Sequence, residues 1–552
     1  MVKKKTSLAL LPLTLCFSSL PVLAATTADL EKRLEQQEKQ IKRLENRLKG
    51  TRAAVKENRS RLSDAADRLK INGFMTAGVA VNDGDDVYEP FYDIDDDYKF
   101  SSISKAGVQM TFEVTEDWDA TVQLLSRGAN DYELQAEWAY LSWQATDSLA
   151  LKFGRQRLPY YLLSEYLDVG YALPWVIPPI ELYNIPSTTT DGISGVYSFN
   201  VGPVNLAAQA YVGQATGYSD QLEASFISSP AWGANLTAEW DSLTLRLGYN
   251  RSTLRTEPDE GGVASSLLEA IEAAESTYGP AYGVEDPGNL EAQSDNISTD
   301  YISAGFMYDN GSLLVMGEIA NLSTETFQPV GDAGYITVGY RFGRWMPHVT
   351  FSKFQTDSKA DDRIRAIQEY ADAVGKAMYA NSGDPNAPGL IEANAGINQA
   401  VNAALGGPVL GTNEIVSAQT CANATVAPAC TGQVLTLMGI RDTLQDAITG
   451  YSESIYNSLE AQIQEQQSYT IGVVYDINPR VKAKLQATHY EAFGKNTYQS
   501  LDYTSTSTPL GSLDTYNGFT TSEGHSNGRF SGDPDAAGNH TAIYSFSIDA
   551  VF

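Results

Sequence analysis

Hydrophobic and polar residues alternate along most of this chain, and its last stretch, residues 541–552, is typical. One face of that stretch carries six apolar residues, and the other face includes Ser545, Ser547 and Asp549. This period of two indicates a strand that lies between two unlike environments. A strand this apolar would aggregate if one edge stayed unpaired. We therefore expect it to have a neighbour on both sides, as in a closed barrel.

Segments with the same alternation recur from residue 71 onward, separated by turn residues. They give sixteen strands, at residues 71–82, 106–114, 118–127, 134–145, 149–155, 192–200, 204–213, 233–240, 243–252, 300–308, 312–321, 335–342, 345–354, 468–477, 480–490 and 541–552. Short turns alternate with long connections throughout. The pattern predicts an all-β fold, a 16-stranded antiparallel transmembrane β-barrel (71–552) around an aqueous lumen.

Residues 29–70 have a different period and are predicted to form an α-helical coiled coil. Six apolar residues fall seven apart, at heptad position a: Leu34, Ile41, Leu48, Val55, Leu62 and Leu69. The other core position is mixed and includes Gln37, Thr51 and Asn58, so the pattern leaves dimer against trimer open. A single amphipathic helix packed on a domain is the alternative, although it would show a wider apolar stripe.

The first residues predict export. Lys3, Lys4 and Lys5 precede the apolar residues 8–23, and small residues precede Ala25, which is typical of a signal peptide over residues 1–24. A short membrane anchor is the alternative. Once Cys16 has left with the signal peptide, the remaining pair, Cys421 and Cys430, predicts one disulfide in an exported protein.

The net charge of the chain limits the partners and solutes that it can bind. The formal net charge is −30, which excludes nucleic acid as a partner because phosphate binding needs clustered Lys and Arg. In a pore, an acidic balance predicts cation preference or passage of neutral solutes. No run reaches the roughly 20 apolar residues of a membrane-spanning helix, so a helical membrane protein is excluded.

The third long connection, residues 156–190, is too apolar for a solvated loop tip. Leu162, Leu163, Leu167, Val176 and Ile177 all need burial. The large shelters near a barrel loop are the barrel itself and a neighbouring subunit. We therefore expect this connection to fold inward or against a second copy.

These features together resemble trimeric bacterial outer-membrane porins with an N-terminal coiled coil. They are the signal peptide, the heptads, the sequence FGRQRLP at residues 153–159, the apolar third connection, sixteen strands and a terminal Phe. The similarity is to the phosphate-selective and dicarboxylate-type porins, although the acidic charge of this chain departs from phosphate selectivity. The resemblance implies a homotrimer among outer-membrane lipid and lipopolysaccharide, with the coiled coil in the periplasm. It also implies that Phe552 is the signal for the outer-membrane assembly machinery.

The resemblance further implies passive diffusion of small hydrophilic solutes through a pore that the third loop narrows. The constriction candidates on that loop are the acids Glu165, Asp168 and Glu181 and the aromatics Tyr160, Tyr161, Tyr166 and Trp175. The basic candidates on the pore wall are Lys152, Arg246, Arg341, Lys482 and Lys484. Opposed charges would set a transverse field across the passage. The alternatives are that the aromatics pack the loop against the wall and that the basic residues are merely solvated.

Other regions carry weaker signals. Asp93, Asp95 and Asp97 in the first loop are a Ca²⁺ candidate, although the spacing lacks the features of an EF-hand and a solvated acidic loop is the alternative. No cofactor is expected. The long connections at about 253–299 and 355–467 are predicted to be extracellular and partly helical.

Two other functions compete with a channel. In one, the protein is a structural tether or adhesin whose coiled coil links the outer membrane to the cell wall. In the other, it is an outer-membrane enzyme, but the four histidines, His348, His489, His525 and His540, form no recognisable catalytic or metal-spaced group in the sequence. The sequence therefore favours a channel and predicts no enzymatic activity.

Overall fold

The computed structural model describes residues 68–83, 87–88, 92, 94–185, 187–219, 223–261, 265, 269, 297–324, 330–380, 390–405, 434–436, 438–439, 463–493, 495–504, 515–525, 531–532 and 540–552, and scattered positions between 32 and 56. The chain divides into two compact units, Met1–Leu69 and Lys70–Phe552. No helix within these ranges is long and apolar enough to cross a membrane.

The described positions of the first unit between residues 32 and 56 are helical. Lys39 Nζ lies 2.7 Å from Glu35 Oε1, the spacing of an i, i+4 pair on a helix. The heptad positions Leu34, Ile41, Leu48, Val55 and Leu62 lie outside the described residues, as do the signal peptide, Asp93, Cys421 and Cys430. Leu69, which we expected as the last coiled-coil core residue, is instead the first residue of strand β1.

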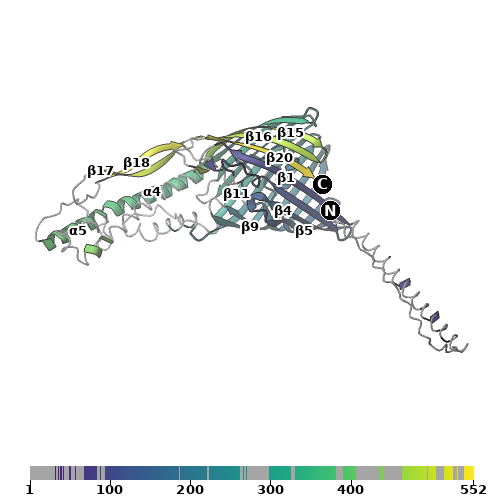
Figure 1. Ribbon diagram of the computed structural model, residues 1–552, viewed down its shortest axis with the longest axis horizontal. Helices are drawn as coiled ribbons and strands as arrows, with labels where there is room; N and C mark the ends of the chain where they lie inside the picture. Colours follow the sequence, from purple (N-terminus) through teal and green to yellow (C-terminus); the bar gives the residue numbers. More distant parts are fainter. Residues whose placement is uncertain are drawn as a thin grey trace, which may run out of the picture. The chain divides into compact units, whose positions relative to one another are not determined.

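The second unit is built on a closed antiparallel barrel of sixteen strands (Figure 1). In chain order they are β1 (Leu69–Asn82), β3 (Lys105–Glu113), β4 (Trp118–Arg127), β5 (Leu134–Thr146), β6 (Leu149–Arg157), β7 (Thr189–Val201), β8 (Val204–Ser219), β9 (Ala224–Trp240), β10 (Leu243–Pro258), β11 (Ile297–Asp309), β12 (Leu313–Thr324), β13 (Gly331–Tyr340), β14 (Trp345–Thr356), β15 (Glu465–Asn478), β16 (Val481–Ala492) and β20 (His540–Val551). Each corresponds to one strand expected from the sequence, so the predicted barrel is confirmed.

The barrel closes where its last strand meets its first. Phe74 pairs with Val551 and Asn82 with Ile543, and β20 pairs with β16 on its other side. Gly73 and Phe552 exchange two backbone hydrogen bonds, at 2.8 and 2.9 Å. The terminal strand therefore has the two neighbours that its apolar face demanded.

Several long connections contain structure of their own. Two helices, α4 (Ser358–Ala380) and α5 (Leu390–Leu405), follow β14. Two small sheets pair β17 (Lys495–Thr504) with β18 (Thr515–His525) and β2 (Val87–Tyr88) with β19 (Ser531–Gly532). Three short 3₁₀ helices complete the described elements: η1 (Gly128–Asn130), η2 (Ser164–Tyr166) and η3 (Gly170–Ala172). The sequence indicated helices in the connection after β14 but not the two small sheets.

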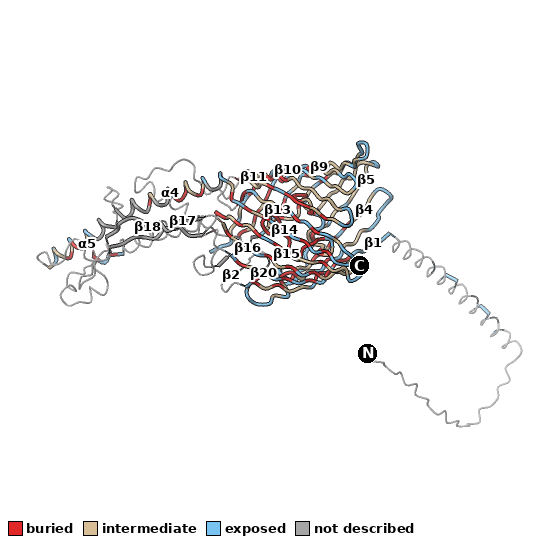
Figure 2. Tube along the Cα trace, turned by 90° about the horizontal axis from the view of Figure 1, so that it is seen from above, coloured by how far each residue is buried: buried red, intermediate tan, exposed pale blue. Residues whose placement is uncertain are grey.

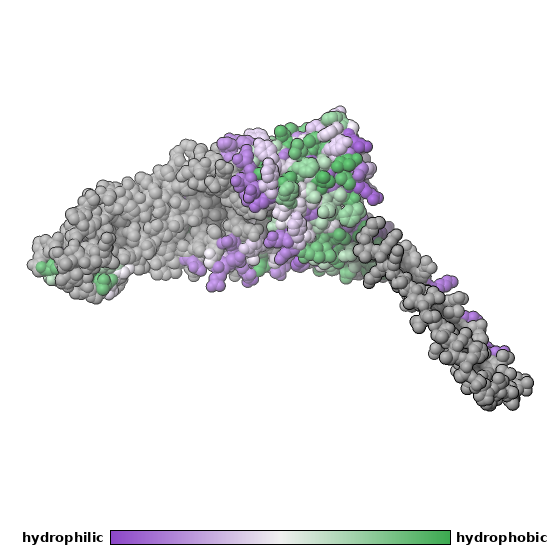
Figure 3. Space-filling view, in the orientation of Figure 1, coloured by the Kyte–Doolittle hydropathy of each residue, from purple (hydrophilic) through white to green (hydrophobic). Residues whose placement is uncertain are grey.

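The strands bury polar residues and expose apolar ones. In β14, Thr350 and Ser352 are 4% and 0% exposed, whereas Val349 and Phe351 between them are 55% and 39% exposed. The same alternation recurs along neighbouring strands (Figure 2), and hydrophobic residues are prominent on the barrel surface (Figure 3). This is the reverse of a soluble domain. An apolar exterior with a polar interior is the arrangement of a transmembrane barrel.

Candidate pore constriction

We call the connection between β6 and β7 loop 3, and its described residues, 158–185 and 187–188, lie inside the barrel. Trp175 Nε1 donates a hydrogen bond to Thr350 Oγ1 of β14 at 2.9 Å. The backbone N–H of Val176 donates to Gln486 Oε1 of β16 at 2.7 Å. Thr350 and Gln486 both belong to the buried, inward-facing sets of their strands. The barrel interior therefore provides the burial that the apolar residues of loop 3 required.

Aromatic packing holds loop 3 against the wall. Tyr161 and Tyr183 lie 4.9 Å apart between ring centroids, and Trp175 meets Tyr335 of β13 edge-on at 5.3 Å. Tyr160 lies 5.1 Å from Tyr301 of β11. All of these rings are at most 9% exposed. Three of the four predicted aromatics, Tyr160, Tyr161 and Trp175, thus anchor the loop.

A buried ion pair fastens the middle of loop 3 to the barrel seam. Lys484 Nζ of β16 lies 3.0 Å from Asp549 Oδ2 of β20, and both side chains are 1% exposed. The same ammonium group donates to the carbonyl oxygens of Gly170 and Trp175 in loop 3. Asp549 also accepts a hydrogen bond from Thr76 Oγ1 of β1 at 2.6 Å. The pair therefore joins loop 3 to three strands.

Two buried carboxylates make further attachments through neutral donors. Glu181, in loop 3, accepts hydrogen bonds from Ser352 Oγ and from Gln466 Nε2, the latter at 2.8 Å. Glu318, on β12, accepts from the backbone N–H of Leu162 at 2.9 Å. Loop 3 is thus held along β12 to β16 as well as at the seam.

The remaining loop acid belongs to a cluster of five charges. Asp168 lies 3.1 Å from Arg127, 3.0 Å from Arg157 and 3.8 Å from Lys105. Glu137 lies 2.6 Å from Arg127 and 3.2 Å from Arg157. Three cations therefore share two carboxylates, which leaves one positive charge in excess.

Two opposing effects act on the Asp168 carboxyl group. Burial alone would raise its pKa, because the charged form loses hydration, but the three nearby cations outweigh this and hold the pKa below its usual value. Asp168 is therefore a stable anion in this cluster. For Tyr160, burial raises the pKa to about 12, so its hydroxyl stays protonated.

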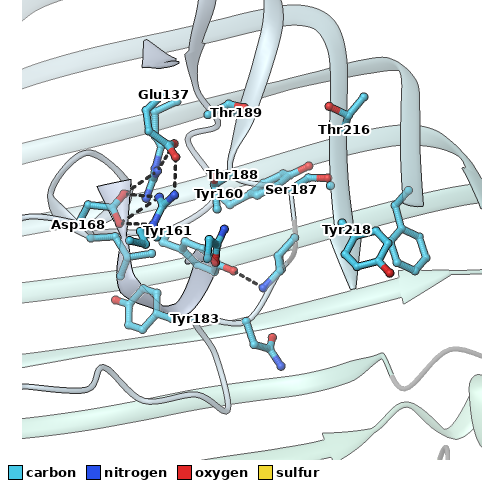
Figure 4. A pocket seen from close by; sticks show the side chains of 18 of the residues that line it. Glu137, Tyr160, Tyr161, Asp168, Tyr183, Ser187, Thr188, Thr189, Thr216 and Tyr218 are labelled. Carbon is cyan, nitrogen blue, oxygen red and sulfur yellow. Dashed lines mark hydrogen bonds and ion pairs between the residues drawn. The ribbon is translucent and has the colours of Figure 1, made fainter. Parts of the chain in front are cut away.

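A cavity of about 1100 Å³ remains beside loop 3. Its lining includes the charged cluster, Tyr160 of loop 3, and Thr216 and Tyr218 of β8. Figure 4 shows Glu137 and Asp168 on one side of this space and Thr216 and Tyr218 on the other. The cavity is therefore eccentric, since loop 3 contacts the barrel wall at β13 to β16 and β20, on the other side of the lumen.

Three of the wall cations named from the sequence contact the backbone of loop 3. Lys484 is buried under loop 3 with Asp549. Lys482 donates to the carbonyl oxygen of Tyr171 at 2.9 Å, and Arg246 donates to that of Pro159 at 2.6 Å. The expectation that Lys484 opposes a loop acid across an open passage is therefore wrong. All three side chains donate to backbone carbonyl oxygens of the loop, and Lys484 also pairs with the carboxylate of Asp549 on the wall.

The other named residues lie elsewhere. Arg341 forms an ion pair with Asp309 at 2.6 Å beside a short turn, and Lys152 lies over the ring of Tyr140 at 5.0 Å. Glu165 and Tyr166 are exposed on loop 3. In the first loop, Asp95 forms an ion pair with Lys99 at 2.7 Å. Asp97 donates its backbone N–H to the Asp95 carboxylate at 3.0 Å.

The sequence analysis missed Lys105, Arg127, Arg157 and Glu137. Arg127 carried a usable signal, because it continues the inward alternation of Thr121, Gln123 and Leu125 in β4. Glu137 carried none, since a register shift in the pairing of β4 with β5 at Gln123/Leu124 interrupts the alternation there.

No family model matches the sequence, and no curated protein matches it. Among solved structures, the outer-membrane channel DcaP of Acinetobacter baumannii is similar at 7% identity and a TM-score of 0.42, covering 88% of this chain and 97% of that one. A loop-deletion mutant of OmpT from Vibrio cholerae has 9% identity and a TM-score of 0.40, covering 88% and 99%. OprB of Pseudomonas putida has 10% identity and a TM-score of 0.39, covering 90% and 96%. The barrel assignment rests on the strand pairing described above and not on these similarities.

Proposed function

We propose that the protein is a bacterial outer-membrane porin, through which small hydrophilic solutes diffuse passively. The observation that carries this proposal is loop 3 inside a closed barrel, where a space of about 1100 Å³ lies beside it. Sixteen strands enclose a lumen wider than side chains can fill. An inward loop then sets the size limit for solutes.

The charged cluster supports weak selectivity by charge. Asp168 and Glu137 sit among Arg127, Arg157 and Lys105, so opposite charges lie within 4 Å of one another and largely cancel. The whole chain is strongly acidic, at −30. The excess of acidic residues over the whole chain favours cations near the mouth of the barrel. The charged cluster beside loop 3 has one positive charge in excess and therefore opposes the entry of cations there. We therefore propose passage of neutral solutes with a mild cation preference.

Single-channel recording tests this function. The purified full chain, shown to be folded by its β-sheet circular dichroism, is added to a planar lipid bilayer. Stepwise conductance increases without any energy source are expected, and neutral polymers of increasing size should reveal a sharp cut-off. A folded protein that inserts without conductance steps would refute the proposal.

A salt gradient tests the selectivity separately. The reversal potential should show a small cation preference that shrinks at 1 M salt. The reason is that the Debye length falls from about 10 Å at 0.1 M to about 3 Å, so charges on the outer loops no longer act on the passage. Clear anion selectivity would contradict this part of the proposal without affecting passive transport.

We also propose that the protein is a homotrimer with its coiled coil in the periplasm. The support is the heptad pattern of residues 29–70, together with the position of β1 directly after it. The same heptads favour the second candidate function, a tether to the cell wall. Removing residues 26–69 separates the two, because a porin should still conduct, whereas a tether should lose attachment to isolated cell wall.

A further inference from the structure

Two of the four histidines, 51 residues apart in sequence, lie side by side on the outside of the barrel. His489 is in β16 and His540 is the first residue of β20. In β16 the residues Lys484, Gln486 and Thr488 are buried toward the lumen, whereas Leu485 is 58% exposed. His489 shares the face of Leu485 and is exposed, and His540 shares the exposed face of Tyr544. Both imidazoles therefore point away from the lumen.

The strand register brings these histidines together with a carboxylate. His489 pairs with Ala542, and Glu491 pairs directly with His540. The two imidazole centroids are 5.7 Å apart, with 52° between the ring planes. Neither imidazole makes a hydrogen bond to another residue in the part of the chain that the structure describes. Glu491 Oε2 accepts a hydrogen bond from Gln467 Nε2 of β15 at 2.9 Å, which orients the carboxylate.

This spacing suits two imidazoles on one metal ion. A Zn–N bond is about 2.0–2.1 Å, so the centroids of two imidazoles on one roughly tetrahedral ion lie about 5–6 Å apart. Imidazole nitrogen is a ligand for zinc, copper and nickel. Among the described residues, no group of three or more His, Cys, Asp and Glu side chains is arranged to hold a metal. Such a site would therefore have two protein ligands, with water in the other positions.

We propose that His489 and His540 bind one divalent transition-metal ion, such as Zn²⁺, on the outer face of the barrel. The ion then links β16 to β20, the strand that closes the barrel. Glu491, directly across from His540, adds a negative charge that favours a cation there. The site lies at the end of β16 that leads into a long connection, outside the channel, so it is independent of the proposed transport.

Calorimetric titration with ZnCl₂ tests the site, using the full chain purified without a histidine tag in detergent micelles. Binding of one ion per chain is expected for the native protein. His489→Asn and His540→Asn should each weaken that binding at least ~10-fold. The double variant provides the background from acidic loops and cysteines. Leu485→Ala, which alters an exposed residue on the same face of β16 that has no metal-binding atom, is the control for surface changes.

A second measurement identifies the atoms that bind the metal. Electron paramagnetic resonance of the native protein with one equivalent of Cu²⁺ should show nitrogen coupling from imidazole, and either single variant should remove the two-nitrogen pattern. Two results would overturn the proposal. One is Zn²⁺ binding by the double variant equal to that of the native protein. The other is a Cu²⁺ spectrum of the native protein with oxygen ligands only.

Discussion

Replacing Lys484 with Met should loosen loop 3 and destabilise the whole barrel. The substitution keeps most of the side-chain volume but removes the ammonium group that lies 3.0 Å from Asp549 and donates to the Gly170 and Trp175 carbonyl oxygens. Asp549 would then be a buried carboxylate that keeps hydrogen bonds from the hydroxyl groups of Thr76 and Ser547 but has lost its direct ion-pair partner. Losing one partner of a buried ion pair costs about 3–5 kcal/mol, mainly through the charge left unpaired.

The matched variant isolates that charge. Lys484→Met combined with Asp549→Asn removes the orphan carboxylate, so the double variant should recover about half of the lost unfolding free energy or more. Urea unfolding in lipid vesicles gives the free energies of unfolding of the native protein, of Lys484→Met, of Asp549→Asn and of the double variant. The double-mutant cycle then gives the coupling energy between Lys484 and Asp549.

Channel recordings supply an independent readout. Because two loop carbonyls lose their donor, Lys484→Met should show frequent conductance fluctuations that the native channel lacks. Two results together would refute the reasoning about this ion pair: a loss below about 1 kcal/mol for Lys484→Met, and strict additivity in the double variant.

Three further predictions concern other contacts. Asp168→Asn leaves Glu137 as the one carboxylate among the three cations of the cluster, so the reversal potential should shift in the direction of anion selectivity. In the native protein the reversal potential should stay constant between pH 7 and 5. That constancy follows because a lowered pKa keeps the carboxylate charged, and its stabilising contribution is lost only as the pH falls through the folded-state pKa. Trp175→Ala removes a side chain that is 1% exposed, so it should cost about 3–5 kcal/mol in urea unfolding and raise the conductance; an unchanged conductance would place the passage elsewhere. Phe552→Asn should lower the amount of heat-resistant protein in outer-membrane fractions, with Tyr544→Asn as a control for a simple loss of exposed apolar surface.

The barrel was predictable because its cause is local. Every strand has one face toward the barrel exterior and one toward the lumen, and this causes its apolar and polar residues to alternate. Residues such as Leu245 and Leu247, both well exposed on the barrel surface, can therefore be assigned to the outer face without knowing which strands lie beside them. Boundaries were less accurate in β8 and β9, which continue to Ser219 and start at Ala224. There, cross-strand pairing extends beyond the apolar pattern.

The constriction was only partly predictable. The apolar residues of loop 3 indicated burial, but the cations beside Asp168 are not the wall cations named from the sequence, because that choice depends on which strands lie opposite a given loop residue. Lys484 and Arg127 both point inward, and sequence alone offers no means to tell which of them meets a carboxylate of the loop and which meets its backbone. That choice follows from the path of loop 3, which the hydrogen bonds to Thr350 and Gln486 help to fix.

The seam contacts of loop 3 also set an order of events during assembly. Gly170 and its donor Lys484 are 314 residues apart, and Asp549 lies near the end of the chain. Contacts between such distant residues form late, because a long segment must first be ordered. Loop 3 can therefore dock fully only after β20 has joined β16. Until that moment loop 3 remains an undocked apolar segment, so the barrel closes and this segment becomes buried in the same step.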